Sequence, residues 1–191
     1  MVISGPTKSG KTELTKQIVL NASRLIHPPP EKIIWCYTEW QEAYKDIPCE
    51  FIEGVPDLTM LKEDKSRKLV ILDDLMDTIK AKDLNTVFVK GAHHWQMSVI
   101  HITQNPFFGG MRTARINTHY LLLLKNPSDK LQIKTLANQM YPGQQKFFFD
   151  AFTDATSKPF GYLLVDMEPT TDDRLRLRTN IFDHLLVYVY K

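Results

Sequence analysis

The stretch SGPTKSGKT, residues 4–12, stands almost at the start of the sequence. Residues 5–12 fit the pattern G-x-x-x-x-G-K-[ST] in full, and an apolar run (1–4) precedes them while a helical pattern follows. Glycines in such a loop let backbone N–H groups turn inward around phosphate oxygens. A helix that opens at Gly10 adds the positive end of its dipole. The stretch therefore predicts a phosphate-binding loop, and the alternative is a plain turn rich in glycine and lysine.

Two residues of the loop are expected to contact the nucleotide and its metal ion. Lys11 is expected to reach the β- and γ-phosphates, and Thr12 to ligate Mg²⁺. The predicted cofactors are therefore ATP and Mg²⁺. The predicted nucleotide-binding residues are Gly5, Pro6, Thr7, Lys8, Ser9, Gly10, Lys11 and Thr12.

Beyond the loop, apolar runs of strand length alternate with helical patterns. The expected strands are 1–4, 32–38, 68–74, 98–104, 119–125, 160–166 and 174–179, with a short one at 51–52. The expected helices are 10–26, 39–46, 75–91, 128–140 and 143–156, with a short basic helix after residues 106–110. Strands separated by helices predict an α/β fold with a mostly parallel sheet flanked by helices. Such sheets bind ligands at the carboxyl ends of their strands.

The bulk composition is that of one ordinary globular domain. A length of 191 residues suits a single domain, 1–191, with one sizeable core. The net charge of +2, from 24 basic and 22 acidic residues, excludes a surface that coats polyanions. The first strand is short for one that carries a phosphate loop, so we expect the domain to be trimmed at its N-terminus.

The sequence also bears on the compartment. No apolar run approaches the roughly 20 residues of a membrane helix, so no membrane is expected as a partner. Gly5, Pro6 and Lys8 interrupt any signal-peptide core. Cys36 and Cys49 form no metal or redox motif, which favours reduced thiols in an intracellular compartment.

Two adjacent acids end the most apolar run, KLVILDD (68–74). A carboxylate at the carboxyl end of a buried strand suits a contact to Mg²⁺ through water, and that role falls to Asp73. Asp74, one residue on, could polarise an attacking water as general base. The alternative for the pair is a cap for the helix that follows. Glu39, just after the second strand, competes with Asp74 for the role of base.

Gln104 and two arginines add further candidates. Gln104 ends the run SVIHITQ, where a neutral amide can orient a water beside the γ-phosphate; the alternative is a strand-end hydrogen bond. Arg112 and Arg115 lie three apart on a short helical stretch and share a face. Either could be an arginine finger supplied to the nucleotide of a neighbouring subunit, and the alternative is a solvated basic face.

Three alternating arginines close the pattern. Arg174, Arg176 and Arg178 would project to one side of a strand over 174–179. Such a row could meet DNA phosphates or an adjacent subunit. An edge strand kept soluble by its charge explains the row equally well.

Taken in order, these blocks resemble a known family. GPTKSGKT, LVILDD, AHHWQMSVIHITQN, the arginine before INTHYLLLLKNPSD, and GYLLVD followed by RLRT are similar to the viral DNA-packaging ATPases of the FtsK/HerA superfamily. The nearest branch is that of large DNA viruses and Maverick/Polinton-type virus-like elements. The match covers nearly the whole chain, and its most specific parts are the HH-to-TQN and NTHYLLLLKNPSD blocks.

The resemblance implies a RecA-like P-loop core. The strand of Gln104 would lie between the loop strand and the strand of Asp73, with Gln104 sensing the γ-phosphate. Arg112 matches the family's arginine better than Arg115 and is the favoured finger in trans. Many ring ATPases carry Glu where Asp74 stands, so the resemblance leaves the base open between Asp74 and Glu39.

It also implies a function and partners. The chain would form a homo-oligomeric ring, a pentamer or hexamer, that uses ATP to drive double-stranded DNA into a capsid, with capsid or portal proteins as partners. The expected location is a viral assembly site inside the host cell. Two alternatives stay open: a nucleotide-gated assembly scaffold that hydrolyses little, and a P-loop kinase of nucleosides or nucleotides.

Overall fold

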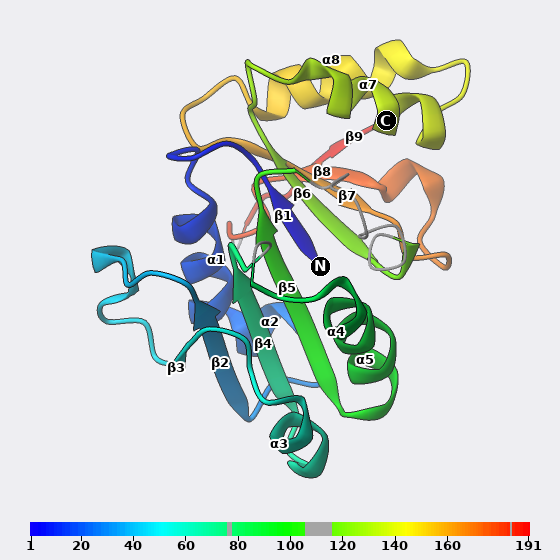
Figure 1. Cartoon of the computed structure of the whole chain (residues 1–191). Coiled ribbons are helices and arrows are strands. Elements are labelled where there is room, and N and C mark those ends of the chain that lie inside the picture. The colour runs from blue at the N-terminus through cyan, green and yellow to red at the C-terminus, as the bar shows by residue number, and fades with distance from the viewer. Residues whose placement is uncertain (76–77, 106–115, 184) are drawn as a thin grey trace.

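One twisted sheet organises the chain (Figure 1). The structure is a computed structural model that describes residues 1–75, 78–105, 116–183 and 185–191, and only the backbone at Ala81 and His93. Among these residues nine strands run in the order β3-β2-β4-β5-β1-β6-β7-β8-β9. Their bounds are β1 Val2–Ser4, β2 Lys32–Tyr37, β3 Glu50–Glu53, β4 Lys68–Asp73, β5 Met97–Thr103, β6 Tyr120–Leu124, β7 Tyr162–Asp166, β8 Leu177–Thr179 and β9 Tyr188–Tyr190.

The sheet has a parallel part and an antiparallel part. Strands β3 through β6 pair in parallel, and β7, β8 and β9 continue the sheet antiparallel. Parallel strands need crossover connections, which the helices provide. The α-helices are α1 Lys11–Leu20, α2 Ala22–Leu25, α3 Leu58–Glu63, α4 Ala81–Thr86, α5 Ala92–His94, α7 Lys130–Met140 and α8 Gln145–Ala155. The 3-10 turns are η1 Glu42–Tyr44 and η3 Asp173–Leu175, and η2 Val87–Gly91 is a π-helical segment.

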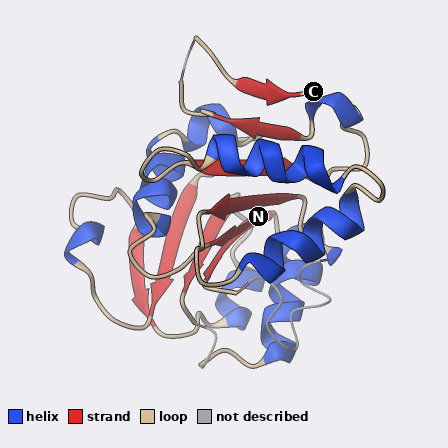
Figure 2. Cartoon of the chain, turned by 90° about the horizontal axis from the view of Figure 1, so that it is seen from above, coloured by secondary structure: helices blue, strands red, loops and turns tan. Residues whose placement is uncertain are grey.

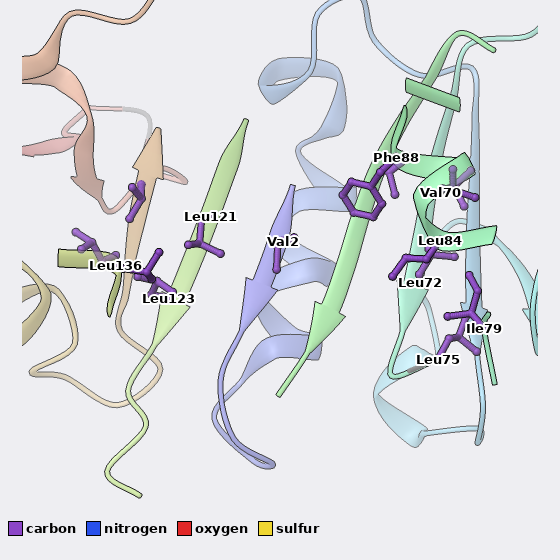
Figure 3. Close-up of a cluster of buried hydrophobic side chains, with 14 of the residues drawn as sticks. Val2, Val70, Leu72, Leu75, Ile79, Leu84, Phe88, Leu121, Leu123 and Leu136 are labelled. Atoms are coloured by element: carbon purple, nitrogen blue, oxygen red, sulfur yellow. The ribbon is translucent and has the colours of Figure 1, made fainter. Parts of the chain in front are cut away.

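Helices cover both faces of the sheet (Figure 2). On one face, side chains of α3, α4, α7 and α8 join alternate strand residues in one buried cluster. In Figure 3, Leu84 of α4 lies beside Leu72, and Leu136 of α7 lies beside Leu123. On the other face, α1 and η1 pack against the strand residues in between, such as Leu69 and Ile71. Every residue of β4 is buried, as expected of a central parallel strand covered on both sides. The continuous apolar run at 69–72 is the sequence signature of this position.

The predicted fold class is confirmed: the chain is α/β, with a mostly parallel sheet flanked by helices. The expected strand order is also confirmed, because β5, which leads to Gln104, lies between β1 and β4. The sequence analysis did not predict α3 or β9, which are only six and three residues long.

Three predicted helices are shorter than expected. The helix over 10–26 breaks at Asn21, whose backbone and side-chain nitrogens both donate to the Gln17 carbonyl. Over 39–46 the described helical structure is the single turn η1. Among the described residues, the helix after Asp74 is α4, which begins at Ala81. Asp74 itself takes a positive φ of 52°, which is not a helical conformation.

The predicted strand over 174–179 is wrong in its first half. Residues 173–175 form the turn η3, and β8 comprises only Leu177–Thr179. Each arginine pairs with a nearby carboxylate: Arg174 with Asp172, Arg176 with Asp173 and Arg178 with Asp166. These pairs hold the three side chains to different local partners, so no arginine row projects from one side of a strand.

Candidate functional site

The carboxyl ends of three neighbouring strands meet at one edge of the sheet. Ser4 of β1 lies in register with Thr103 of β5, and Ile102 of β5 lies in register with Asp73 of β4. Just beyond the strands, the Gly5 N–H donates to the Thr103 carbonyl at 3.3 Å, and the Asp74 N–H donates to the Ile102 carbonyl at 3.3 Å. The start of the glycine loop, Gln104 and the acidic pair are therefore brought together, as the sequence predicts for a ligand site.

Both glycines of the loop are needed where they stand. A Cβ at Gly5 would lie 2.7 Å from the Ser9 Oγ and 2.9 Å from the Leu124 Cβ. Gly10 has a φ of 98°, a conformation that a side chain disfavours, and directly precedes the first residue of α1. The loop can thus curl closely in front of the helix.

Lys11 is folded back onto this loop. Its Nζ donates to the carbonyls of Gly5 at 2.8 Å and Pro6 at 2.9 Å. Burial lowers the pKa of Lys11, while the charges of Asp74 and Asp73 act in the opposite direction. The ammonium therefore lies within electrostatic reach of both acids.

The loop also holds polar groups that suit phosphate oxygens. The Ser9 Oγ is buried and has no hydrogen-bond partner among the described residues. No described side chain caps the N-terminus of α1, whose first N–H groups have no partner inside the helix. These donors and the Lys11 ammonium form a cradle whose chemistry fits a phosphate chain. Thr12, in the first turn of α1, is half-buried beside them.

Asp73 is buried and held in one orientation. Its Oδ2 accepts hydrogen bonds from the Tyr44 hydroxyl at 2.8 Å and from the Trp35 Nε1 at 3.2 Å. Burial raises the pKa of Asp73; the bonds from Tyr44 and Trp35 oppose this rise, Asp74 adds to it and Lys11 opposes it. A nearby divalent cation would favour the ionised form of such a carboxylate, so Asp73 fits a place beside Mg²⁺.

The sequence did not point to Trp35 and Tyr44 as partners of Asp73. Trp35 comes from the neighbouring strand β2, and Tyr44 comes from η1. The two rings contact each other with centroids 5.2 Å apart. Trp35, Tyr44 and Asp73 are far apart in the sequence, so no short motif predicts the hydrogen bonds between them. The only trace is the aromatic content of the segments KIIWCYT and EAY.

Asp74 and Glu39 stay as rivals for the role of base. Asp74 is exposed at the end of β4, two strands from β1; Glu39 is exposed beyond the end of β2, one strand farther away. The charge of Asp74 acts on Lys11. The alternative that the acidic pair caps the next helix is wrong, because Lys80 occupies the position before α4.

Gln104 is exposed at the end of β5, between the glycine loop and Asp74. The strand-end turn is closed by its neighbours, since the Thr103 Oγ1 accepts from the Asn105 N–H and donates to the Asn105 carbonyl, each at 3.2 Å. The Gln104 carbonyl accepts from the Ser4 Oγ at 3.5 Å. The predicted arginines, Arg112 and Arg115, lie outside the described residues.

His101 is buried on β5, three residues before Gln104, and its pKa is lowered to about 4 from 6.5, chiefly by burial. Between about pH 4 and pH 6.5, the imidazole is therefore neutral in the folded chain and protonated in the unfolded chain. We expect the stability that this contributes to be complete above pH 6.5 and to be lost as the pH falls through about 4, by up to about 3 kcal/mol.

Urea denaturation of the parent chain and of His101→Asn between pH 7 and pH 4 would check this. The parent is expected to lose more stability over this range than the variant, and the slope with pH is read rather than the absolute stability. Equal slopes in the two proteins would contradict the prediction.

Comparisons with known proteins add no family to this geometry. Neither the models of protein families nor the curated proteins give a match to the chain. Among the described residues, no three His, Cys, Asp or Glu side chains gather in a way that could hold a metal by themselves. None of the described helices is long and apolar enough to cross a membrane.

Proposed function

We propose that the chain is the ATP-hydrolysing subunit of a ring motor that translocates double-stranded DNA into a viral capsid. The observation that carries the enzymatic part is the order β4-β5-β1, which sets the acidic pair, Gln104 and the glycine loop side by side. The same order supports a RecA-like P-loop core. The packaging role rests on the resemblance of the sequence blocks to viral packaging ATPases.

Each group at this edge has a part in hydrolysis. Lys11 would exchange the Gly5 and Pro6 carbonyls for the β- and γ-phosphates of the nucleotide. Gln104 would orient the attacking water, and Asp74 would accept its proton. Bound Mg²⁺, held by Thr12 and through water by Asp73, would neutralise charge on the phosphates. Water is the favoured acceptor over a nucleoside, because an exposed carboxylate and an exposed amide flank the place of attack.

In the proposed ring, a neighbouring subunit completes the set of cations around the phosphates. Charge that develops on the phosphates is met here by Lys11, and Arg112 of a neighbouring subunit would supply the rest. A ring also suits the small net charge of +2, since repeated subunits can hold DNA through few contacts each. Capsid or portal proteins would anchor the ring.

Mixing two inactive variants tests both the hydrolysis and the ring. We expect Lys11→Ala and Arg112→Ala subunits each to turn over little ATP in the presence of duplex DNA and Mg²⁺. A 1:1 mixture should recover about a quarter of the parent rate, because random pairing joins an intact loop to an intact arginine at that share of boundaries. ATP turnover and mass in solution, with and without duplex DNA, are the measurements.

The alternatives give different results in the same assay. A nucleotide-gated scaffold shows little turnover alone or in any mixture, and a kinase passes phosphate to an added nucleoside. A parent chain whose ATP turnover equals that of Lys11→Ala would overturn the enzymatic proposal. Turnover by the parent without recovery in the mixture would overturn the finger in trans.

A further inference from the structure

Phe160 is an aromatic residue in an unusual position beside the glycine loop. It lies in the turn between α8 and β7 and is 68% exposed. A Cβ built on Gly10 would come within 2.7 Å of the Phe160 Cδ1, so the ring lies directly against the Gly10 backbone. Some 150 residues of chain separate two groups that touch.

The turn fixes the ring in this place. Phe160 has a φ of 61°, a conformation that non-glycine residues rarely adopt. The next residue, Gly161, donates from its N–H to the Lys158 carbonyl at 3.0 Å, and a Cβ there would lie 2.5 Å from the Ala155 carbonyl oxygen. The chain thus holds an exposed aromatic ring in a tight turn, although Tyr162 and Leu164 of the following strand are buried.

A pocket joins this ring to the loop. Its volume is about 370 Å³, and it is lined by Lys8 and Ser9 of the loop, by Lys125 after β6, and by residues 156–161. This volume lies within the range of small-molecule sites, about 300–1,000 Å³. The lining includes the apolar pair Pro159 and Phe160 and the three lysines Lys8, Lys125 and Lys158, beside small and hydroxyl residues. An apolar pair with cations around it suits a ligand that has both a flat ring and phosphates.

We propose that Phe160 is the platform on which the purine base of the bound nucleotide stacks, with the phosphates in the loop of residues 5–12. The inference rests on the proposed function and assigns the base end of the same site. Aromatic side chains stack on nucleobases through their π faces, and removing such a ring weakens binding by about 5- to 150-fold. A purine offers a larger face than a pyrimidine, so the ring favours ATP over CTP.

Stacking on the base can be separated from an effect on the loop by using a ligand without a base. The measurement is the affinity for each ligand by calorimetric titration in the presence of Mg²⁺. The ligands are ATP, CTP and inorganic tripolyphosphate, and the proteins are the parent, Phe160→Ala, Phe160→Trp and Leu131→Ala. Leu131 of α7 is about as exposed as Phe160, at 69%, and serves as the matched control. Urea denaturation of each variant checks that it is folded.

We expect Phe160→Ala to weaken ATP binding at least about fivefold and to leave tripolyphosphate binding within about twofold. Phe160→Trp should keep the affinity for ATP, and indole fluorescence should fall when ATP binds. The preference of the parent for ATP over CTP should shrink in Phe160→Ala. Leu131→Ala should bind all three ligands as the parent does.

Several outcomes overturn the inference. Equal weakening of ATP and tripolyphosphate in Phe160→Ala would mean that the ring only positions the loop through Gly10. Unchanged ATP binding in Phe160→Ala would exclude stacking and would leave the proposed function in place. Weakened ATP binding with intact tripolyphosphate binding, in a chain that never hydrolyses ATP, would support the platform and overturn the motor. A parent that binds neither ATP nor tripolyphosphate would overturn both the platform and the proposed function.

Discussion

Replacing Lys11 by alanine is expected to lower ATP turnover by on the order of 100- to 1,000-fold, the usual loss when one preorganised charge at a transition state is removed. In the structure the Lys11 ammonium is partly buried and bonded to the Gly5 and Pro6 carbonyls. It is therefore placed inside the loop before any nucleotide arrives. Alanine cannot replace this charge, and it also removes the Lys11 charge that acts on Asp73.

The loss should appear in turnover more than in stability. Lys11 lies in the first turn of α1, where alanine is a good helix former, and the two carbonyls that it bonds belong to the loop just before this helix. We expect the free energy of unfolding in urea to change by less than about 1 kcal/mol. The measurement is steady-state phosphate release with Mg²⁺ and duplex DNA.

Lys62→Ala is the matched control. Lys62 is an exposed lysine of α3, which covers the sheet away from the glycine loop, so its loss should leave turnover unchanged (Figure 1). A Lys11→Ala chain that keeps more than about a tenth of the parent rate would show that Lys11 does not act on the transferred phosphate.

The sequence predicted the sheet because its central strands are buried on both faces. Apolar runs such as LVIL at 69–72 are typical of buried strands. The loop of residues 5–12 then indicated at which end of these strands the site lies. Helix ends were predicted less well, because they depend on single residues. Asn21 breaks a helix through its side chain, and Asp74 leaves the helical conformation through its positive φ.

Contacts between distant segments left the weakest signals. The bonds from Trp35 and Tyr44 to Asp73 join β2 and η1 to β4, and no spacing in the sequence shows them. Gly10 follows β1 and Phe160 precedes β7, and the two residues meet because only β6 separates these strands in the sheet. The arginines at 174–178 alternate as in a strand, yet their pairing with nearby aspartates sets the local structure.

Replacing Asp74 by asparagine is expected to lower ATP turnover by about 100- to 10,000-fold, the range associated with a general base, while ATP binding stays within about threefold. Asp74 is exposed beside Gln104 and acts on Lys11 through its charge, whereas Glu39 stands one strand farther from the loop. Asparagine keeps the shape of the side chain and tolerates the φ of 52° at this position. The substitution therefore removes the basic oxygen without disturbing the turn.

Glu39→Gln is the matched comparison, because it makes the same chemical change in the rival acid. Turnover in Glu39→Gln should stay within about threefold of the parent, measured in the same assay as Asp74→Asn. The reverse result, a large loss in Glu39→Gln and a small one in Asp74→Asn, would move the role of base to Glu39. Gln104 follows β5 and Glu39 follows β2, with β4 between these two strands. That result would therefore also require the attacking water to lie on the β2 side of β4, away from Gln104.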